Sequence, residues 1–278
     1  MRRVRAAETF VGFDSAWTDN PRAPGAICAV ALAADGTATF HPPRLARFGD
    51  ALDFIEAVAA DYTLIALDQP TIVANPTGMR PAERVAAAAI SWLGGGVQPA
   101  SRARTGMFCD AAPIWPFLAA LGANDDPLAA REAAAGRHVM EVFPALALAA
   151  FEPAFACRRG APKYNPSNPL YRPDDWRRVA AAAATQYDRW QLPEPAAWCQ
   201  DAATLSRPRK ADQDRLDAML CLAIALHWRR APAGQSIMIG DLDSGYIVAP
   251  LAPALCDRLR VAAALHGVAI DGTVVSMR

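Results

Sequence analysis

The sequence predicts an α/β fold in which a mixed sheet, three antiparallel strands and then parallel strands, is flanked by helices. Two observations predict the sheet, and a third predicts an insertion in the domain. Short β-rich runs separated by turn residues open the chain, and a continuous apolar run follows the first helical pattern. A third, the alanine-rich middle, predicts a helical insertion within the same domain. A chain of 278 residues is long enough to bury the core that such a fold needs.

The first quarter of the chain predicts a β-β-β-α-β order. An Asp35-Gly36 turn signal joins the second and third strands as a hairpin. The last run, YTLIALD, suits a strand that is buried on both faces. The expected elements are strands at residues 9–17, 25–34 and 37–41, a helix at 49–60 and a strand at 62–68.

Later segments predict a single domain over residues 1–278, with residues 76–136 as the helical insertion. The clearest helical pattern is near the end of the chain, at 211–229. The remaining expected elements are a strand at 137–143, helices at 174–190 and 252–266, a hairpin at 236–250 and a short apolar run at 267–276.

Composition excludes few functions. Lys plus Arg equals Asp plus Glu at 28 each, so net charge argues neither for nor against a nucleic-acid partner. Six cysteines without a CxxC pair disfavour a zinc ribbon and suit reduced thiols in a cytoplasmic protein. No apolar run is long enough for a membrane span, and the basic start MRRVRAAETF is not a convincing signal peptide.

Two aspartates stand where predicted strands end. Asp14 follows an apolar strand, and Asp68 follows the buried run that ends in Asp68-Gln69-Pro70. In α/β sheets, ligands bind at the carboxyl ends of the strands, so neighbouring strands would aim both acids into one crevice. The alternative for either residue alone is a turn former or a helix cap.

Asp214 and Asp217 give the stronger signal. Residues three apart share a helix face, where two like charges repel by a few tenths of a kcal/mol. Asp217 also borders the apolar stripe of its helix, and a half-buried acid needs a partner. A divalent metal held jointly by several carboxylates would satisfy all of them. The alternative is a capping aspartate with a salt bridge to Lys210 or Arg215.

An all-oxygen cluster favours Mg²⁺ or Mn²⁺ over zinc. The four histidines are not paired at HxxxH or HxH spacing, which agrees with that choice. Glu141, at the end of the strand-like HVMEVFP, is a fifth candidate catalytic acid. Its alternative is a pair with one of the loop arginines.

These residues together resemble a known pattern. The β-β-β-α-β order, the acids on its strands and the late D-x-x-D-A helix look like the RNase H superfamily, and the helix is similar to that of Holliday-junction resolvases. More closely, the chain resembles the bacterial "domain of unknown function 429" family of predicted nucleases with an RNase H fold. The matching pieces are Gly12-Phe13-Asp14, Asp68-Gln69-Pro70, Glu141-Val142-Phe143-Pro144, Asp214 to Ala218, Gly240-Asp241 and Gly245-Tyr246-Ile247-Val248.

By this resemblance, Asp14, Asp68, Asp214 and Asp217 match the metal-binding acids of the superfamily, which implies a two-metal nuclease. Resolvases usually have glutamate where this chain has Asp68. Nucleic acid is then the expected partner. The candidate phosphate contacts are Arg80, Arg102, Arg104 and Lys163, and the candidate base-stacking side chains are Trp17, Tyr164 and Trp92.

Two other classes of function stay open. RNase H-like sheets are shared with the actin and sugar-kinase group, so a phosphotransferase is one alternative, with Gly94-Gly95-Gly96 approaching a phosphate. No GxxxxGK[ST] motif supports it. The other alternative is a non-catalytic binding protein with a degenerate site. The sequence predicts no oligomeric state.

Overall fold

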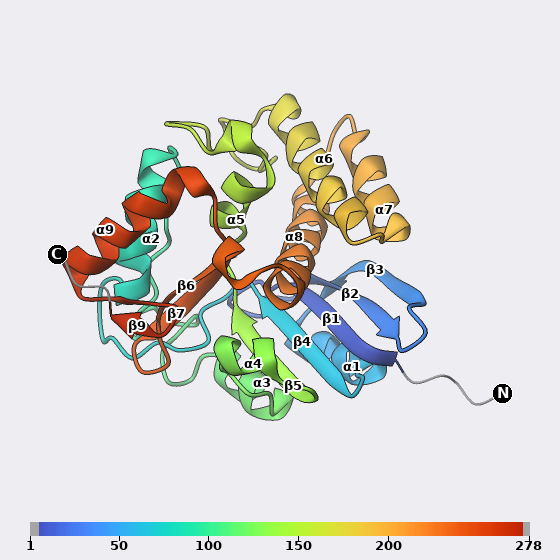
Figure 1. Cartoon of the computed structure of the whole chain (residues 1–278), viewed down its shortest axis with the longest axis horizontal. Helices are drawn as coiled ribbons and strands as arrows, with labels where there is room; N and C mark the ends of the chain where they lie inside the picture. Colours follow the sequence, from blue (N-terminus) through green and yellow to red (C-terminus); the bar gives the residue numbers. More distant parts are fainter. Residues whose placement is uncertain (1–5, 275–278) are drawn as a thin grey trace.

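The computed structural model describes residues 6–274, and its centre is a five-stranded mixed sheet in the order β3-β2-β1-β4-β5. β1 pairs antiparallel with β2, and β2 with β3, whereas β1–β4 and β4–β5 are parallel. The predicted mixed sheet is therefore confirmed (Figure 1). Its strands are β1 Ala6–Asp14, β2 Gly25–Ala33, β3 Ala38–Ala46, β4 Tyr62–Leu67 and β5 Gly136–Glu141.

Helices cover both faces of this sheet (Figure 1). Side chains alternate along each strand, so Phe10 and Ala66 face one apolar core and Phe13 and Leu67 face the other. The first core includes α5 Pro144–Phe151, α6 Pro173–Arg189, α7 Pro193–Ala203 and α8 Lys210–Arg230. The second includes α1 Phe48–Val58 and α3 Ile114–Leu121, and the short α4 Pro127–Glu132 lies beside β5.

Helix α8 lies directly on β1. A Cβ atom at Gly12 would stand 2.1 Å from the carbonyl oxygen of Ala218 and 2.4 Å from the backbone nitrogen of Leu222. Glycine is therefore required at this strand position, because any side chain would separate the helix from the sheet. This close approach fixes which residues of α8 lie near the end of β1.

A second, four-stranded sheet in the order β7-β6-β8-β9 was not predicted. Its strands are β6 Ser236–Asp241, β7 Gly245–Pro250, β8 Ala269–Ile270 and β9 Thr273–Val274. The expected hairpin is confirmed as β6–β7, and a parallel bridge between Val142 and Val248 joins it to the first sheet. α2 Pro81–Trp92 and α9 Cys256–His266 pack against this sheet. Residues 275 and 276 of the predicted last run lie outside the described residues.

Three further elements differ from the expectation. α5 and α7 were not predicted, although each has proline in its first turn, a favoured helix-start position. β3 continues through Pro42 and Pro43 to Ala46 because it is an edge strand, where the missing N–H groups cost little. None of the helices within residues 6–274 is both long and apolar enough to cross a membrane.

Candidate functional site

Asp14 and Asp68 lie side by side at the carboxyl ends of neighbouring parallel strands. Phe13 pairs with Leu67, and the backbone N–H of Asp68 donates to the Phe13 carbonyl at 2.9 Å. Adjacent strands are about 4.8 Å apart, so the two aspartates start from neighbouring positions. Asp14 is two residues beyond Gly12, which faces α8, and strand alternation therefore directs both acids toward that helix.

Helix α8 adds Asp214 and Asp217 to this region, and both are more than nine-tenths buried. Burial raises the pKa of Asp14 well above its usual range, and the charges of Asp217, Asp68 and Asp214 raise it further. The pKa of Asp68 is raised in the same way by burial and by Asp217. The structure thus brings the four predicted acids together, while their catalytic and metal-binding roles stay predictions.

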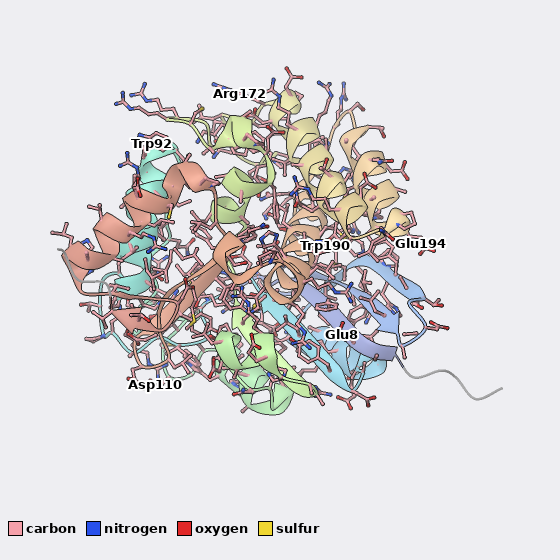
Figure 2. All side chains as sticks on the ribbon, viewed as in Figure 1. Glu8, Trp92, Asp110, Arg172, Trp190 and Glu194 are labelled. Carbon is pink, nitrogen blue, oxygen red and sulfur yellow. The ribbon has the colours of Figure 1, made fainter. Side chains whose placement is uncertain are left out.

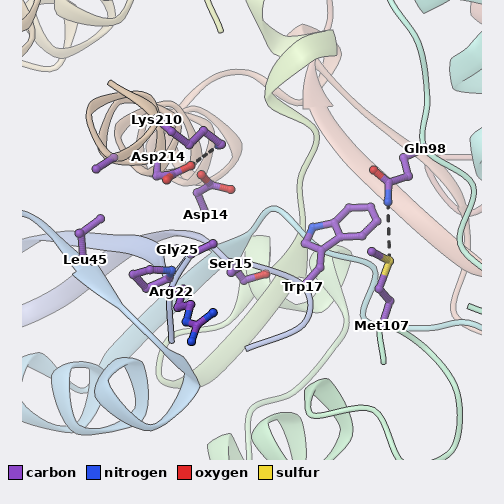
Figure 3. A pocket seen from close by; sticks show the side chains of 14 residues that line it. Asp14, Ser15, Trp17, Arg22, Gly25, Leu45, Gln98, Met107, Lys210 and Asp214 are labelled. Carbon is purple, nitrogen blue, oxygen red and sulfur yellow. Dashed lines mark hydrogen bonds and ion pairs between the residues drawn. The ribbon is translucent and has the colours of Figure 1, made fainter. Parts of the chain in front are cut away.

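The acids of α8 already have partners within the chain. Lys210 forms an ion pair with Asp214 across one helical turn, directly above Asp14 (Figure 3). Tyr164 Oη donates to Asp217 at 2.7 Å, and Gln213 Nε2 donates to its other oxygen at 2.8 Å. Burial raises the pKa of Asp217 to about 6 despite these two hydrogen bonds and the charge of Lys210. The pair with Lys210 is the alternative that the sequence left open for Asp214.

A divalent cation fits the chemistry of these donors. Four carboxylates supply hard oxygen ligands, and the buried Oε1 atom of Gln213 has no hydrogen-bond partner. The geometry is not that of a loaded site: within residues 6–274, no three acid, histidine or cysteine side chains converge on a metal position. Lys210 and Tyr164 occupy some of the lone pairs of Asp214 and Asp217, and the remaining lone pairs of these carboxylates can serve a cation.

Hydrogen bonds from neutral side chains connect the segments that follow β1 and β4. The Ser15 hydroxyl donates to Gln69 Oε1, and Trp17 Nε1 donates to the Asp68 carbonyl at 2.8 Å. Gln69 is fully buried. Sequence reasoning assigned no role to Ser15 or Gln69; the signal was a polar residue directly after the acid that ends each apolar strand.

Two cavities open on the acids. The first, of about 460 Å³, is lined by Asp14, Asp214 and Lys210 (Figure 3). The second, of about 200 Å³, is lined by Asp68. Trp17 and Gln98 line both, so the indole stands between the cavity of Asp14 and that of Asp68.

Glu141 ends the neighbouring strand β5 on the other face of the sheet from Asp68, but it lines the second cavity together with Asp68, and its charge raises the pKa of that acid. It pairs in register with Leu67, which faces the opposite side of the sheet from Asp68. Its carboxylate receives Arg80 Nη1 at 2.7 Å and Nη2 at 2.5 Å, while Arg80 Nε binds Glu83 at 2.9 Å. Burial raises the pKa of Glu141 to about 7, against the charge of Arg80. The structure therefore contains the arginine pair that the sequence left open for Glu141, and the partner is Arg80.

This pairing corrects one candidate phosphate contact. Arg80 is only 1% exposed, and its donors bind Glu83, Glu141 and the Ile72 carbonyl. It lies on the wall of the second cavity, but its charge is already matched by two glutamates. Arg80 thus holds the sheet edge to α2 and has no surface position from which to contact a nucleic-acid backbone.

The other predicted contact residues have separate surroundings. Arg102 pairs with the exposed Asp110, seen at the edge of the molecule in Figure 2, and Lys163 Nζ donates to the Gly94 carbonyl at 2.6 Å. Arg104 is exposed and makes no side-chain hydrogen bond or ion pair within the described chain. The hydroxyl of Tyr164 donates to Asp217, and base stacking by its ring stays a prediction.

We predict that the metal-free protein is more stable at pH 5.5 than at pH 7.5. The folded-state pKa of Asp217 is raised, so its contribution to stability is present at low pH and is lost as pH rises through about 6. Asp217 alone should account for about 1 kcal/mol of the difference. Urea melts in EDTA at both pH values measure it, and Asp217→Asn should flatten the dependence. An unchanged dependence in Asp217→Asn would contradict the prediction.

A comparison with protein families identifies a relationship over most of the chain. The model of the family described as "Protein of unknown function (DUF429)" matches residues 12–239. The matched region contains all four aspartates and ends within β6. No curated protein and no solved structure matches the chain. Because the match covers most of the sequence, the chain belongs to the DUF429 family of proteins of unknown function.

Proposed function

We propose that this protein is a metal-dependent nuclease whose single RNase H-like domain spans residues 1–278, with residues 76–136 inserted in it. The observation that carries the proposal is that four aspartates meet at one sheet edge: one ends β1, one directly follows β4 and two lie on α8. Three antiparallel strands followed by parallel ones, with acids on the first and fourth strands and a late D-x-x-D helix, support the RNase H-like assignment.

The cost of gathering these acids favours a cation as their natural partner. Burial and mutual repulsion raise the pKa of Asp14, Asp68 and Asp217, whereas Lys210 is the cation that opposes this. One ammonium group offsets only part of four negative charges. Mg²⁺ or Mn²⁺ held by these carboxylates would supply a Lewis acid that polarises a phosphoryl oxygen and lowers the pKa of water.

The chain's own groups have distinct tasks in this proposal. The backbone of β1 and β4 fixes Asp14 and Asp68 at neighbouring positions, and Tyr164 orients the Asp217 carboxylate. Lys210 is half-exposed and lines the open cavity, so it can contact a phosphate once it leaves Asp214. Among the predicted phosphate contacts, Arg104 is exposed, and its guanidinium has no partner within the described residues.

Asp14→Asn tests the proposal. Single-stranded, branched and hybrid nucleic acids are incubated with protein and Mn²⁺, and Mn²⁺ binding is followed by calorimetric titration. The wild-type protein should bind Mn²⁺ and cleave at least one substrate, and Asp14→Asn should lose both activities. Its metal-free stability should be unchanged or higher, because one repelling charge is gone.

Arg207→Gln, which removes an exposed charge before α8, is the matched control and should behave like wild type. Unchanged Mn²⁺ affinity in both Asp14→Asn and Asp217→Asn would refute the metal site. ATP turnover without cleavage would favour the phosphotransferase alternative.

A further inference from the structure

The cavity beside Asp14 and Asp214 has an apolar wall that carboxylate chemistry alone does not require. Trp17, Met107 and Leu45 line it, and Leu45 is 37% exposed. Its volume of about 460 Å³ lies within the usual range for small-ligand pockets. The acids stand on one side of this space and the indole of Trp17 on the other (Figure 3).

Trp17 is held rigidly at this wall. Its φ of 55° is in the left-handed region, which costs a bulky residue about 1–2 kcal/mol. The N–H bond to the Asp68 carbonyl and an edge contact with Phe108, with ring centroids 5.3 Å apart, fix the indole. A strained residue held by two anchors at a cavity wall indicates a side chain positioned before any ligand arrives.

The polar groups around this wall suit a nucleotide. Arg22 is exposed, lines the cavity and forms no ion pair within residues 6–274. Gln98 offers amide donors and an acceptor beside Met107, whose sulfur is 3.7 Å from Nε2. An aromatic face, an amide and a cation are the groups that recognise the π face, the edge and the phosphate of a nucleotide.

We propose that this cavity binds one unpaired nucleobase of a single strand, stacked on Trp17, with the adjoining phosphodiester beside Asp14 and Asp214. The inference rests on the proposed function, because it names the substrate of that same site. A paired base is covered on both faces by its neighbours in the duplex, so only an unpaired or extruded base can stack on the indole. The substrate is therefore a single strand, or a junction or bulge that exposes one base.

A 2-aminopurine reporter tests the pocket. A single-stranded hexanucleotide that contains 2-aminopurine is titrated with Asp14→Asn protein, and stacking is followed as fluorescence quenching. Two further variants combine Asp14→Asn with Trp17→Phe or with Trp17→Leu. The phenylalanine keeps an aromatic face and the leucine does not, while both lose the N–H bond to the Asp68 carbonyl. Their difference thus isolates stacking, which should be worth about 10-fold in affinity. Trp190→Leu is the control, because Trp190 lies at the C-terminal end of α6 and lines neither cavity.

Relative to the protein with Trp17 intact, Trp17→Leu should bind about 10-fold more weakly, Trp17→Phe should stay close to it, and Trp190→Leu should not change the affinity. The same strand annealed to its complement should quench weakly, and a free nucleoside monophosphate should compete poorly. Equal affinities of the Phe and Leu variants, equal quenching by the duplex or full competition by the mononucleotide would each overturn the proposal.

Failure of the two proposals is distinguishable. Mn²⁺-dependent cleavage that is equal in wild type and Trp17→Leu, without quenching, would remove the base pocket and leave the nuclease. Trp17-dependent quenching with no cleavage by the wild-type protein would leave the pocket and remove the nuclease.

Discussion

Gly12→Ala is expected to lower the free energy of unfolding by about 3 kcal/mol or more. The new Cβ would stand 2.1 Å from the Ala218 oxygen, 2.4 Å from the Leu222 nitrogen and 2.8 Å from its Cβ. Two of these atoms are helix backbone, so no side-chain rotation relieves the clash. Helix α8 must move away from β1, although its face against the sheet is fully buried.

Urea melts measure this effect, and Gly49→Ala is the matched control. Gly49 lies in α1 without a positive φ, and nothing is within 4 Å of a Cβ built there. Alanine at this position should stabilise the protein by about 0.4–1 kcal/mol, because it restricts the unfolded chain. The two glycine variants should thus move in opposite directions. A Gly12→Ala midpoint equal to that of wild type would show that α8 does not rest on β1 as described.

Movement of α8 would also separate Asp214 and Asp217 from Asp14. Gly12→Ala should therefore weaken Mn²⁺ binding even where the protein is still folded. Calorimetric titration at a temperature below the melting transition measures this second effect. Glycine in a strand interior is itself a sequence signal for a close backbone approach, and it could have placed α8 against β1 beforehand.

The sequence predicted the elements whose apolar pattern is long or strongly periodic. Strands β1, β2, β4 and β5 and helix α8 were predicted because burial dictates their composition. The second sheet was not, because β8 and β9 have two residues each, too few for any periodicity. Their pairing depends on β6, which precedes them by a whole helix.

In the candidate site, the acids could be predicted from the sequence, but their hydrogen-bond and ion-pair partners could not. Strand ends and helix spacing identify the four aspartates, since local geometry decides where such residues point. The partners of Glu141 and Asp217 were not predictable, because Arg80 and Tyr164 are 61 and 53 residues away in sequence. Only the tertiary fold decides which distant polar group reaches a buried acid.

Arg80→Met is the second large prediction, with an expected loss of about 3–5 kcal/mol at pH 8. Arg80 is 1% exposed and binds Glu83 and Glu141, which are also buried. Removing the cation leaves two carboxylates in the interior without a counter-charge. The neutral triple variant, Arg80→Met with Glu83→Gln and Glu141→Gln, should lose less than the single variant, because no unpaired charge is left.

The pH dependence of Arg80→Met separates lost charge from lost packing. The pKa of Glu141 is about 7 with Arg80 in place, so its contribution to stability is lost as pH rises through that value. Without Arg80 the pKa rises further, and the cost of the substitution should be larger at pH 8 than at pH 5.5. Urea melts at both values measure it, with Arg102→Met as the control for an exposed pair that contributes under about 1 kcal/mol. If the loss of unfolding free energy is the same at both pH values, Arg80 acts by filling space. If the loss grows with pH, the positive charge of Arg80 is what allows the Glu141 carboxylate to be buried at the end of β5, beside the cavity of Asp68.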